Sequence, residues 1–409
     1  MKQPMKLALI PDNRFSDYRY DVIFKAYKWD PQVEDQNTIA KHVVLMDKKT
    51  AAQLELWAEQ LSEETFLMEE AFGKNPALAK ELSLPKEIRP ALNRLSSYRR
   101  NQHVRLMRFD FHPTTIGWAV SEVNSDVPGG LAEASVLPEI ANRYFDGYAP
   151  RKHVAKSILE AFKPKIKKDG TIAFVHATSY ADDRQVMQFL GDYFNMHGLN
   201  TLYAAPDHIK WVNKRAFSIL EGQAGELDGI VRFFPLEWLV NLPRKCDWKG
   251  YYDTETPSCN HPIAIFAQSK RLPLVWDQLS VEIPAWKTLL PATVYPKLEK
   301  QLAGDWIFKP ALGRVGEGIS IKEAVTAKEL LQIHKAVRRH PKDWVAQRQF
   351  QSRPLTTVDN EEYHLCVGVF TVNGKSAGFY GRISPYPRID AKAKDIPILV
   401  EKEGTSDEQ

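Results

Sequence analysis

The chain has 409 residues, of which 44% are hydrophobic and 26% charged, a composition typical of a globular protein with room for two or three domains. Its formal net charge of +4 is small for this length and gives no reason to expect a nucleic-acid partner. Because the sequence has no secretory signal segment and no run of about 18 apolar residues, we expect a cytoplasmic protein with no membrane partner.

The first 105 residues contain few motifs that suggest chemistry. Leu, Trp and Phe recur at helical spacing in 51–72 and again in 75–95, with glutamates and lysines between them. This spacing predicts two amphipathic helices that cover a sheet.

Two runs of alternating apolar and polar residues, 106–111 and 118–124, predict the strands of a hairpin joined by 112–117. A register that pairs even-numbered residues places four polar side chains on one face: Arg108, Asp110, Glu122 and Asn124. Two carboxylates and an amide oxygen are hard ligands that suit Mg²⁺, and a neighbouring arginine can hold a phosphoryl oxygen. The same side chains fit a salt-bridged, solvated sheet face equally well.

Strands and helices alternate in the next part of the chain, which favours an α/β arrangement with a partly parallel sheet. A helix is expected over 185–194, between strands over 171–176 and 200–204, and a further strand is expected over 228–234. Asp182 and Asp183 fall where the first of these strands turns into the helix, and carboxylates at this position ordinarily cap a helix.

Residues 245–261 predict an irregular crossover and a domain boundary. Cys246, Cys259 and His261 could be imagined as a zinc site. Free thiols are the better interpretation, because the closely spaced cysteine pairs of zinc sites are missing.

Residues 306–321 predict a strand bearing Lys309, a loop with three glycines and a second strand from Ile319. Glycines let backbone amides approach a polyphosphate, because no side chain blocks them. The loop is neither a Walker A nor a Rossmann motif. Further along, Asn373-Gly374 predicts a type I′ turn between two strands of a C-terminal hairpin.

These motifs resemble the synthetase domain of glutathionylspermidine synthase, a member of the wider ATP-grasp ligase group. That family has an Arg-x-Asp strand, a Glu-x-Asn strand, then Ala-Asp-Thr-Pro-Thr-Ser-Leu and a glutamate. Arg108-Phe109-Asp110 and the run EVNSDVPGGLAE from Glu122 to Glu133 look like these parts. The family's Thr-Pro-Thr-Ser, whose hydroxyls lie near the thiol peptide substrate, is Val127-Pro128-Gly129-Gly130 here, so glutathione itself is not carried over.

The resemblance implies a role for each matching position. Arg108 would stabilise the transition state, and Asp110, Glu122 and Asn124 would hold magnesium, with two ions expected. Nucleotide contacts are implied for Lys270, Lys309, Val315, Gly316 and the hinge residues Arg348, Gln349, Phe350 and Gln351. Substrate contacts are implied for Asp182 and Asp183, which correspond to an acidic pair facing the polyamine, and for Arg382 and Asp395.

The implied fold is an α/β (α+β) ATP-grasp fold with a pre-ATP-grasp N-terminal region, in the permuted order in which the metal hairpin precedes the glycine loop. We expect a mostly helical region over 1–105 and a metal-hairpin and substrate region over 106–260. A nucleotide-binding ATP-grasp region would follow over 261–401, and then a disordered tail over 402–409. The cysteine amidase domain of bifunctional relatives is expected to be absent.

The implied function is that of an ADP-forming ligase, dependent on ATP and Mg²⁺, which joins a peptide-like small-molecule acid to an amine through an acyl phosphate. A second hypothesis is a nucleotide-binding scaffold of the same fold that has lost ligation.

Overall fold

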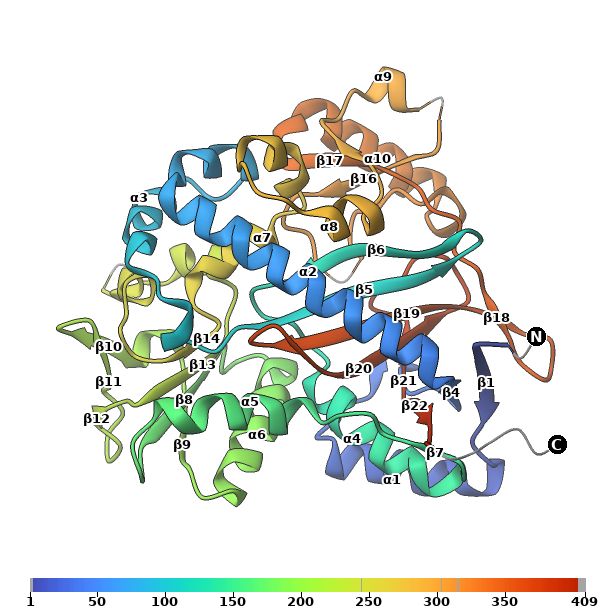
Figure 1. Cartoon of the computed structure of the whole chain (residues 1–409), viewed down its shortest axis with the longest axis horizontal. Helices are drawn as coiled ribbons and strands as arrows, with labels where there is room; N and C mark the ends of the chain where they lie inside the picture. Colours follow the sequence, from blue (N-terminus) through green and yellow to red (C-terminus); the bar gives the residue numbers. More distant parts are fainter. Residues whose placement is uncertain (1–2, 244, 303, 315, 404–409) are drawn as a thin grey trace.

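The computed structural model describes residues 3–243, 245–302, 304–314 and 316–403. The positions of the expected tail from 404 onward therefore lie outside the described residues. The chain folds into several sheets surrounded by helices, as Figure 1 shows. Among the described residues, no helix combines the length and the apolar character needed to span a bilayer.

The central sheet is antiparallel and has the order β21-β20-β19-β5-β6, with β18 paired to β19. The predicted metal hairpin forms β5 and β6, and the predicted C-terminal hairpin forms β19 and β20. In the C-terminal turn Asn373 and Gly374 both have positive φ, as a type I′ turn requires. Strand bounds are Leu106–Thr114 (β5), Gly117–Asn124 (β6), Leu355–Thr356 (β18), Glu362–Val372 (β19), Lys375–Ser384 (β20) and Lys394–Ile396 (β21).

The register predicted for the first hairpin is confirmed at the four polar residues, because Arg108 pairs with Asn124 and Asp110 pairs with Glu122; after Asp110 the register shifts by one residue. On the opposite face Met107, Phe109 and Phe111 are fully buried. Strand β5 continues to Thr114, so the connection predicted over 112–117 is too long, because His112 to Thr114 still pair with β6.

A parallel sheet of order β14-β13-β8-β9 confirms the α/β part of the prediction. Helix α6 packs on β8 and β9. It begins before the predicted start, so Asp182 and Asp183 lie in its first turn. Bounds are Thr171–His176 (β8), Asn200–Ala204 (β9), Gly229–Phe233 (β13), Ser258–Cys259 (β14), Val154–Phe162 (α5) and Ala181–Met196 (α6).

The third part is a small antiparallel sheet of order β15-β17-β16, flanked by α10. The second strand predicted from Ile319 is wrong, because 319–321 form no strand. Ser320 nevertheless bonds Phe308 through both its backbone amide and its hydroxyl, which holds the glycine loop against β16. Bounds are Thr293–Val294 (β15), Trp306–Pro310 (β16), Trp344–Arg348 (β17), Pro284–Leu289 (α8), Leu298–Gln301 (α9) and Ala327–Arg339 (α10).

The N-terminal residues form strands that the sequence did not indicate. They build a sheet of order β1-β4-β22-β7, in which β4 pairs in parallel with the C-terminal strand β22. Helices α1 and α4 pack against each other beside this sheet. Bounds are Met5–Leu9 (β1), His42–Met46 (β4), Tyr148–Ala149 (β7), Ile398–Glu401 (β22), Asp12–Lys25 (α1) and Leu131–Ala141 (α4).

The described residues also contain two smaller sheets: the two-stranded sheet β2-β3 and the three-stranded sheet β10-β11-β12. Their bounds are Gln32–Val33 (β2), Gln36–Asn37 (β3), Ile209–Val212 (β10), Arg215–Ser218 (β11) and Gly225–Glu226 (β12).

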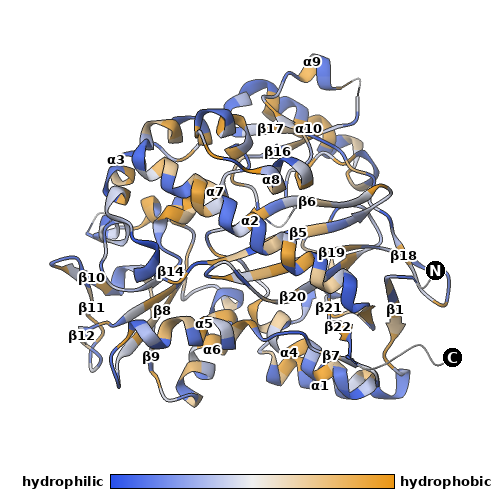
Figure 2. Cartoon of the chain, in the orientation of Figure 1, coloured by the Kyte–Doolittle hydropathy of each residue, from blue (hydrophilic) through white to orange (hydrophobic). Residues whose placement is uncertain are grey.

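Helix α2 (Lys48–Lys74) crosses the central sheet diagonally, as Figure 1 shows, and packs on β5, β19 and β20. Its Phe66 and Phe72 are buried, and Trp57 stacks near Phe111 at 6.4 Å between ring centroids. Figure 2 shows turns of this helix alternating between hydrophobic and hydrophilic, as expected for a helix with one face in the core. The single helix predicted over 75–95 is wrong: the chain forms 3₁₀ turns there around the short helix α3 (Arg89–Leu92).

Arg105 ties α2 to the central sheet. Its guanidinium lies 2.5 Å from Glu69 on α2 and donates to the carbonyl oxygens of Leu106 and Ser125, at the start of β5 and just after β6. Arg105 and Glu69 are each 1% exposed, so the pair is removed from water.

Replacing Arg105 with methionine should therefore destabilise the protein strongly, because it leaves the Glu69 carboxylate buried without a cation. The expected loss is about 3–5 kcal/mol in the free energy of unfolding, measured by urea denaturation. The double variant Arg105→Met, Glu69→Leu should recover much of this loss, since neither charge then remains buried. A double variant as unstable as Arg105→Met alone would show that the hydrogen bonds to the carbonyls matter more than the ion pair.

Candidate active site

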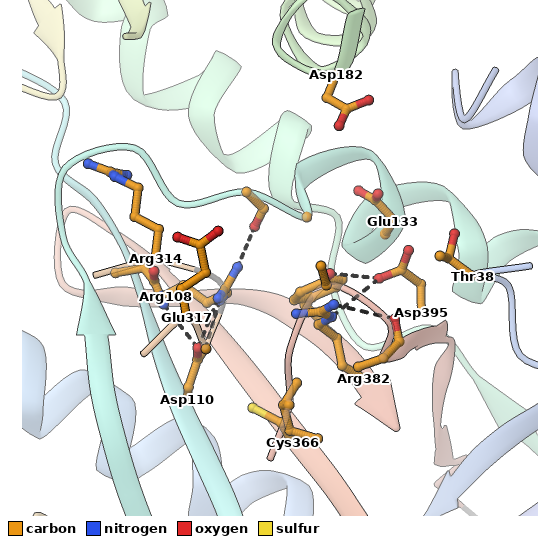
Figure 3. A pocket seen from close by; sticks show the side chains of 18 of the residues that line it. Thr38, Arg108, Asp110, Glu133, Asp182, Arg314, Glu317, Cys366, Arg382 and Asp395 are labelled. Carbon is orange, nitrogen blue, oxygen red and sulfur yellow. Dashed lines mark hydrogen bonds and ion pairs between the residues drawn. The ribbon is translucent and has the colours of Figure 1, made fainter. Parts of the chain in front are cut away.

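A cavity of about 580 Å³ lies where the central sheet, the first turn of α6, the glycine loop and residues 26–38 meet, and we refer to it as the central cavity. Figure 3 shows side chains from these different segments pointing into the same space. The predicted site residues that line it are Arg108, Asp110, Glu122, Asn124, Asp182, Asp183, Lys309, Gly316, Phe350, Arg382 and Asp395.

The hairpin strands β5 and β6 supply the most tightly connected polar group of the cavity. Arg108 binds Asp110 through two hydrogen bonds of 2.7 and 2.9 Å and donates a third, of 2.7 Å, to the carbonyl oxygen of Gly129. Asn124 donates to the same carboxylate at 3.0 Å. Burial acts to lower the pKa of Arg108, but Asp110 outweighs it and raises the pKa, so the guanidinium stays charged.

Two lysines from the C-terminal half approach this group. Lys270 lies 2.8 Å from Glu122 and donates to the carbonyl of Gly313 in the glycine loop at 2.6 Å. Burial alone would raise the pKa of Glu122, but Lys270, Lys309 and Arg108 lower it below its usual value.

Lys309 differs from Lys270 because its ammonium has no ion pair among the described residues. It is 3% exposed, and it donates a long hydrogen bond of 3.3 Å to the carbonyl of Ser121. Burial lowers its pKa to about 8, although Glu122 and Asp110 act in the opposite direction. A buried cation with such weak compensation is suited to an anionic ligand.

The donors predicted for magnesium lie on one face of adjacent strands, because Asp110 pairs with Glu122 and Asn124 contacts Asp110. Across the described residues, no cluster of three or more His, Cys, Asp or Glu side chains is arranged to hold a metal ion. Two carboxylates and an amide are a different donor set, one that phosphate oxygens and water ordinarily complete around Mg²⁺. The residues present fit that ion, and convergence of the three donors on it stays a prediction.

Only one of the predicted hinge residues lines the cavity. Phe350 does so together with Ile307, Ile319 and Ile321, which gives the end beside Lys309 an apolar lining. Arg348 stacks over Trp306, and the backbone amide of Gln349 bonds the carbonyl of Asp305. Gln351 accepts a backbone hydrogen bond from Thr115, and Val315 lies outside the described residues.

Asp182 and Asp183 face the cavity from the first turn of α6, and Figure 3 shows Asp182 directed toward it. The helix has no side-chain cap hydrogen bond, although both carboxylates lie in its first turn, where the helix dipole favours negative charge. Burial, followed by the charge of Asp182, raises the pKa of Asp183 to about 6.

Arg382 and Asp395 lie together at the side of the cavity away from Glu122. The Arg382 guanidinium is 3.8 Å from Asp395 and donates to the carbonyl of Asp390 at 2.6 Å. Its buried Nε has no hydrogen-bond acceptor among the described residues.

Several residues in or beside the cavity were not assigned a role from the sequence. Tyr380 donates to Asp395 at 2.7 Å, and its ring lies 5.0 Å from the Arg108 guanidinium carbon, so it joins the two ends of the site. Gly368 pairs with Asp110, and a Cβ there would lie 2.7 Å from Cδ of Arg108. Arg314 binds Glu237 at 2.6 Å, which fastens the glycine loop to the opposite wall.

The alternative of a zinc site at Cys246, Cys259 and His261 is not supported. The three cysteines are free, and the described residues contain no cluster of that kind.

The comparison with known families shows to which family the chain belongs. Residues 14–401 match the sequence model of a family described as "Glutathionylspermidine synthase preATP-grasp". The chain belongs to this family. Membership places it with carboxylate-amine ligases, as the motifs of the metal hairpin and glycine loop led us to expect.

A solved structure supports the fold. A glutathione synthetase-like effector from Globodera pallida, in its apo form, is 10% identical, with 96% of this chain and 100% of that chain covered at a TM-score of 0.64. A putative gamma-glutamylcysteine synthetase from Methylobacillus flagellatus is 11% identical over 79% of this chain and 87% of that one, at a TM-score of 0.43. No curated protein matches the sequence.

Gly130, in the segment that departs from the family motif, offers a test of how tightly the site is packed. Its φ is +86°, and a Cβ would lie 2.9 Å from three ring carbons of Tyr380. Gly130→Ala should therefore lower the melting temperature and displace Tyr380. Gly198 is a matched control, because its φ is +85° but nothing lies within 4 Å.

We expect Gly198→Ala to cost about 1–2 kcal/mol through its left-handed backbone alone and Gly130→Ala to cost clearly more. Equal losses in urea denaturation would mean that the Tyr380 ring is free to move aside.

Proposed function

We propose that this protein is an ATP- and magnesium-dependent ligase that joins a carboxylic acid to an amine and releases ADP and phosphate. The observation that carries the proposal is Lys309, a buried ammonium without an ion pair among the described residues, next to a carboxylate-rich hairpin. A triphosphate would supply the missing negative charge, and the bound Mg²⁺ would neutralise charge on the phosphate oxygens.

The charges at this end of the cavity favour an anion. Arg108, Lys270 and Lys309 carry three positive charges, whereas Asp110 and Glu122 carry two negative ones. The apolar lining around Phe350 would receive the base of the nucleotide. Lys270 holds the carbonyl of Gly313, so it would also position the glycine loop over the phosphates.

In the proposed reaction the acid carboxylate attacks the γ-phosphorus of ATP, which forms an acyl phosphate and ADP. The amine then attacks the acyl carbon, so that phosphate leaves and the amine nitrogen loses a proton. Arg382 has a buried Nε with no acceptor among the described residues, so it is our candidate for binding the acid. Asp182 and Asp183 would bind the cationic amine.

Arg108 is proposed to stabilise the charge that grows as the phosphoryl group leaves ATP. Arg108→Lys keeps the positive charge but loses the planar guanidinium that would contact the phosphoryl oxygens, so kcat should fall on the order of 10²-fold while nucleotide Kd changes little. Arg105→Lys is a matched control, because Arg105 also binds a buried carboxylate but does not line the cavity.

The competing interpretation makes Arg108 a structural partner of Asp110. Loss of stability and of magnesium affinity, with kcat unchanged in a folded variant, would support that interpretation. Measuring kcat, nucleotide Kd and melting temperature on the same protein separates the two roles.

Lys309 gives a prediction about pH. Its pKa of about 8 means that the ammonium is charged below pH 8 and increasingly neutral above it. A bound phosphate favours the charged form, so ADP affinity should be full below pH 8 and weaken as the pH rises, by up to about tenfold per unit.

Titration of ADP binding by calorimetry between roughly pH 7 and 10 measures this dependence. Lys309→Met should bind ADP more weakly and show little pH dependence over the same range. An unchanged pH profile in Lys309→Met would exclude Lys309 as the titrating group.

The scaffold hypothesis predicts nucleotide binding without turnover. ADP release from ATP and Mg²⁺ with a mixed pool of acids and amines distinguishes the two hypotheses. Sustained ADP release together with an amide product in mass spectrometry supports the ligase, and binding without either supports the scaffold.

A further inference from the structure

Lys28, which follows helix α1, reaches into the central cavity from a part of the chain without recognised motifs. Its ammonium lies 2.7 Å from Oε1 of Glu133 and 2.5 Å from Oδ2 of Asp395. The Lys28 side chain is 20% exposed, and those of Glu133 and Asp395 are 13% and 5% exposed. All three line the cavity, and Figure 3 shows Glu133 and Asp395 beside each other at the end that holds Arg382.

This arrangement is a binding site for a primary ammonium group. Such a group has three N–H donors, and two carboxylates accept from Lys28. The other oxygen of Glu133, Oε2, is buried and has no hydrogen-bond partner among the described residues, so a third acceptor is present. Burial acts to lower the pKa of Lys28, but Asp395 and Glu133 raise it well above its usual value.

The local charges explain why the site has no need of a further cation. Lys28 and Arg382 together balance Glu133 and Asp395, so this group of four side chains has no net charge. Without Lys28 the same group would carry one negative charge and an empty space of the length of a lysine side chain. In contrast, Asp182 and Asp183 form no ion pair within the described part of the chain, although they line the same cavity.

We propose that Lys28 is a specificity-determining residue, whose ammonium fills a carboxylate site at one end of the cavity and prevents a substrate ammonium group from binding there. The inference rests on the proposed function, because it concerns the amine that the ligase accepts. Asp182 and Asp183, which line the same cavity, are then our candidates for binding the cationic part of that amine.

The test uses Lys28→Ala, which removes Cγ, Cδ, Cε and Nζ. These are the heavy atoms of n-propylammonium, so that ion is the probe. The melting temperature of the variant should lie below that of the wild type and rise saturably with propylammonium chloride, measured against sodium chloride at equal ionic strength. The wild type, in which the site beside Lys28 is filled, should show a clearly smaller rise.

Two further variants separate space from charge. Lys28→Met also removes the positive charge but fills most of the space, so propylammonium should have little effect on it. Lys152→Ala removes a lysine that pairs with the buried Glu55 but does not line the cavity, and it should respond no more than the wild type.

A longer probe shows whether the site opens into the cavity. Calorimetry with 1,4-diaminobutane should detect binding to Lys28→Ala that is at least tenfold tighter than to the wild type. Equal affinities of the wild type and Lys28→Ala for 1,4-diaminobutane would overturn the proposal. A Lys28→Ala protein that propylammonium neither binds nor stabilises would also overturn it. The same holds if this variant stays unfolded with and without the probe.

These measurements need neither ATP nor turnover. If Lys28→Ala binds the ammonium probes but the wild type has no ligase activity, the proposed function is wrong and the ammonium site is supported. If the wild type is a ligase but Lys28→Ala binds neither probe, the ammonium site is wrong and the proposed function is supported.

Discussion

The antiparallel pairing of β19 with β5 is the contact on which the rest of the site depends. It sets Gly368 opposite Asp110 and Phe370 opposite Arg108, and it places β20, with Tyr380 and Arg382, one strand further along. In a sheet, alternate residues face opposite sides, so a slip of one residue would turn Arg108 and Asp110 into the core and Phe109 toward the cavity. The buried apolar face of β5 makes that slip unfavourable, and in this way the core fixes the polar face of the site.

The cavity contains many charges, but most of them are already paired. Asp110 is bound by Arg108, Glu122 by Lys270, and Asp395 by Lys28. In a buried setting such pairs avoid the cost of an isolated charge, and they also hold the side chains in fixed positions. Among the described residues the exception near the hairpin is Lys309, so the end that we assign to the nucleotide has an excess of positive charge, whereas the end near Glu133 is balanced.

The N-terminal region contributes to both the fold and the cavity. Strand β4 pairs with β22 at the other end of the sequence, and Arg105 fastens α2 to the start of β5. These contacts hold the segment after α1 in place, and from that segment Lys28 reaches Glu133 and Asp395. The pairing of β4 with β22 and the position of Lys28 mean that the first 105 residues form part of the wall of the site as well as its outer cover.

The sequence by itself determined the hairpin and, given a register that pairs even-numbered residues, the polar face of Arg108, Asp110, Glu122 and Asn124. The reason is that strand alternation and a buried opposite face are local properties, whereas the register shift after Asp110 was not indicated by the sequence. It also determined the family, because three separated motifs occur in a permuted order. Only the tertiary structure decided that Lys28 and Tyr380 belong to the site and that 319–321 form no strand. Each of these depends on contacts between segments far apart in the chain, for which residue spacing carries no signal.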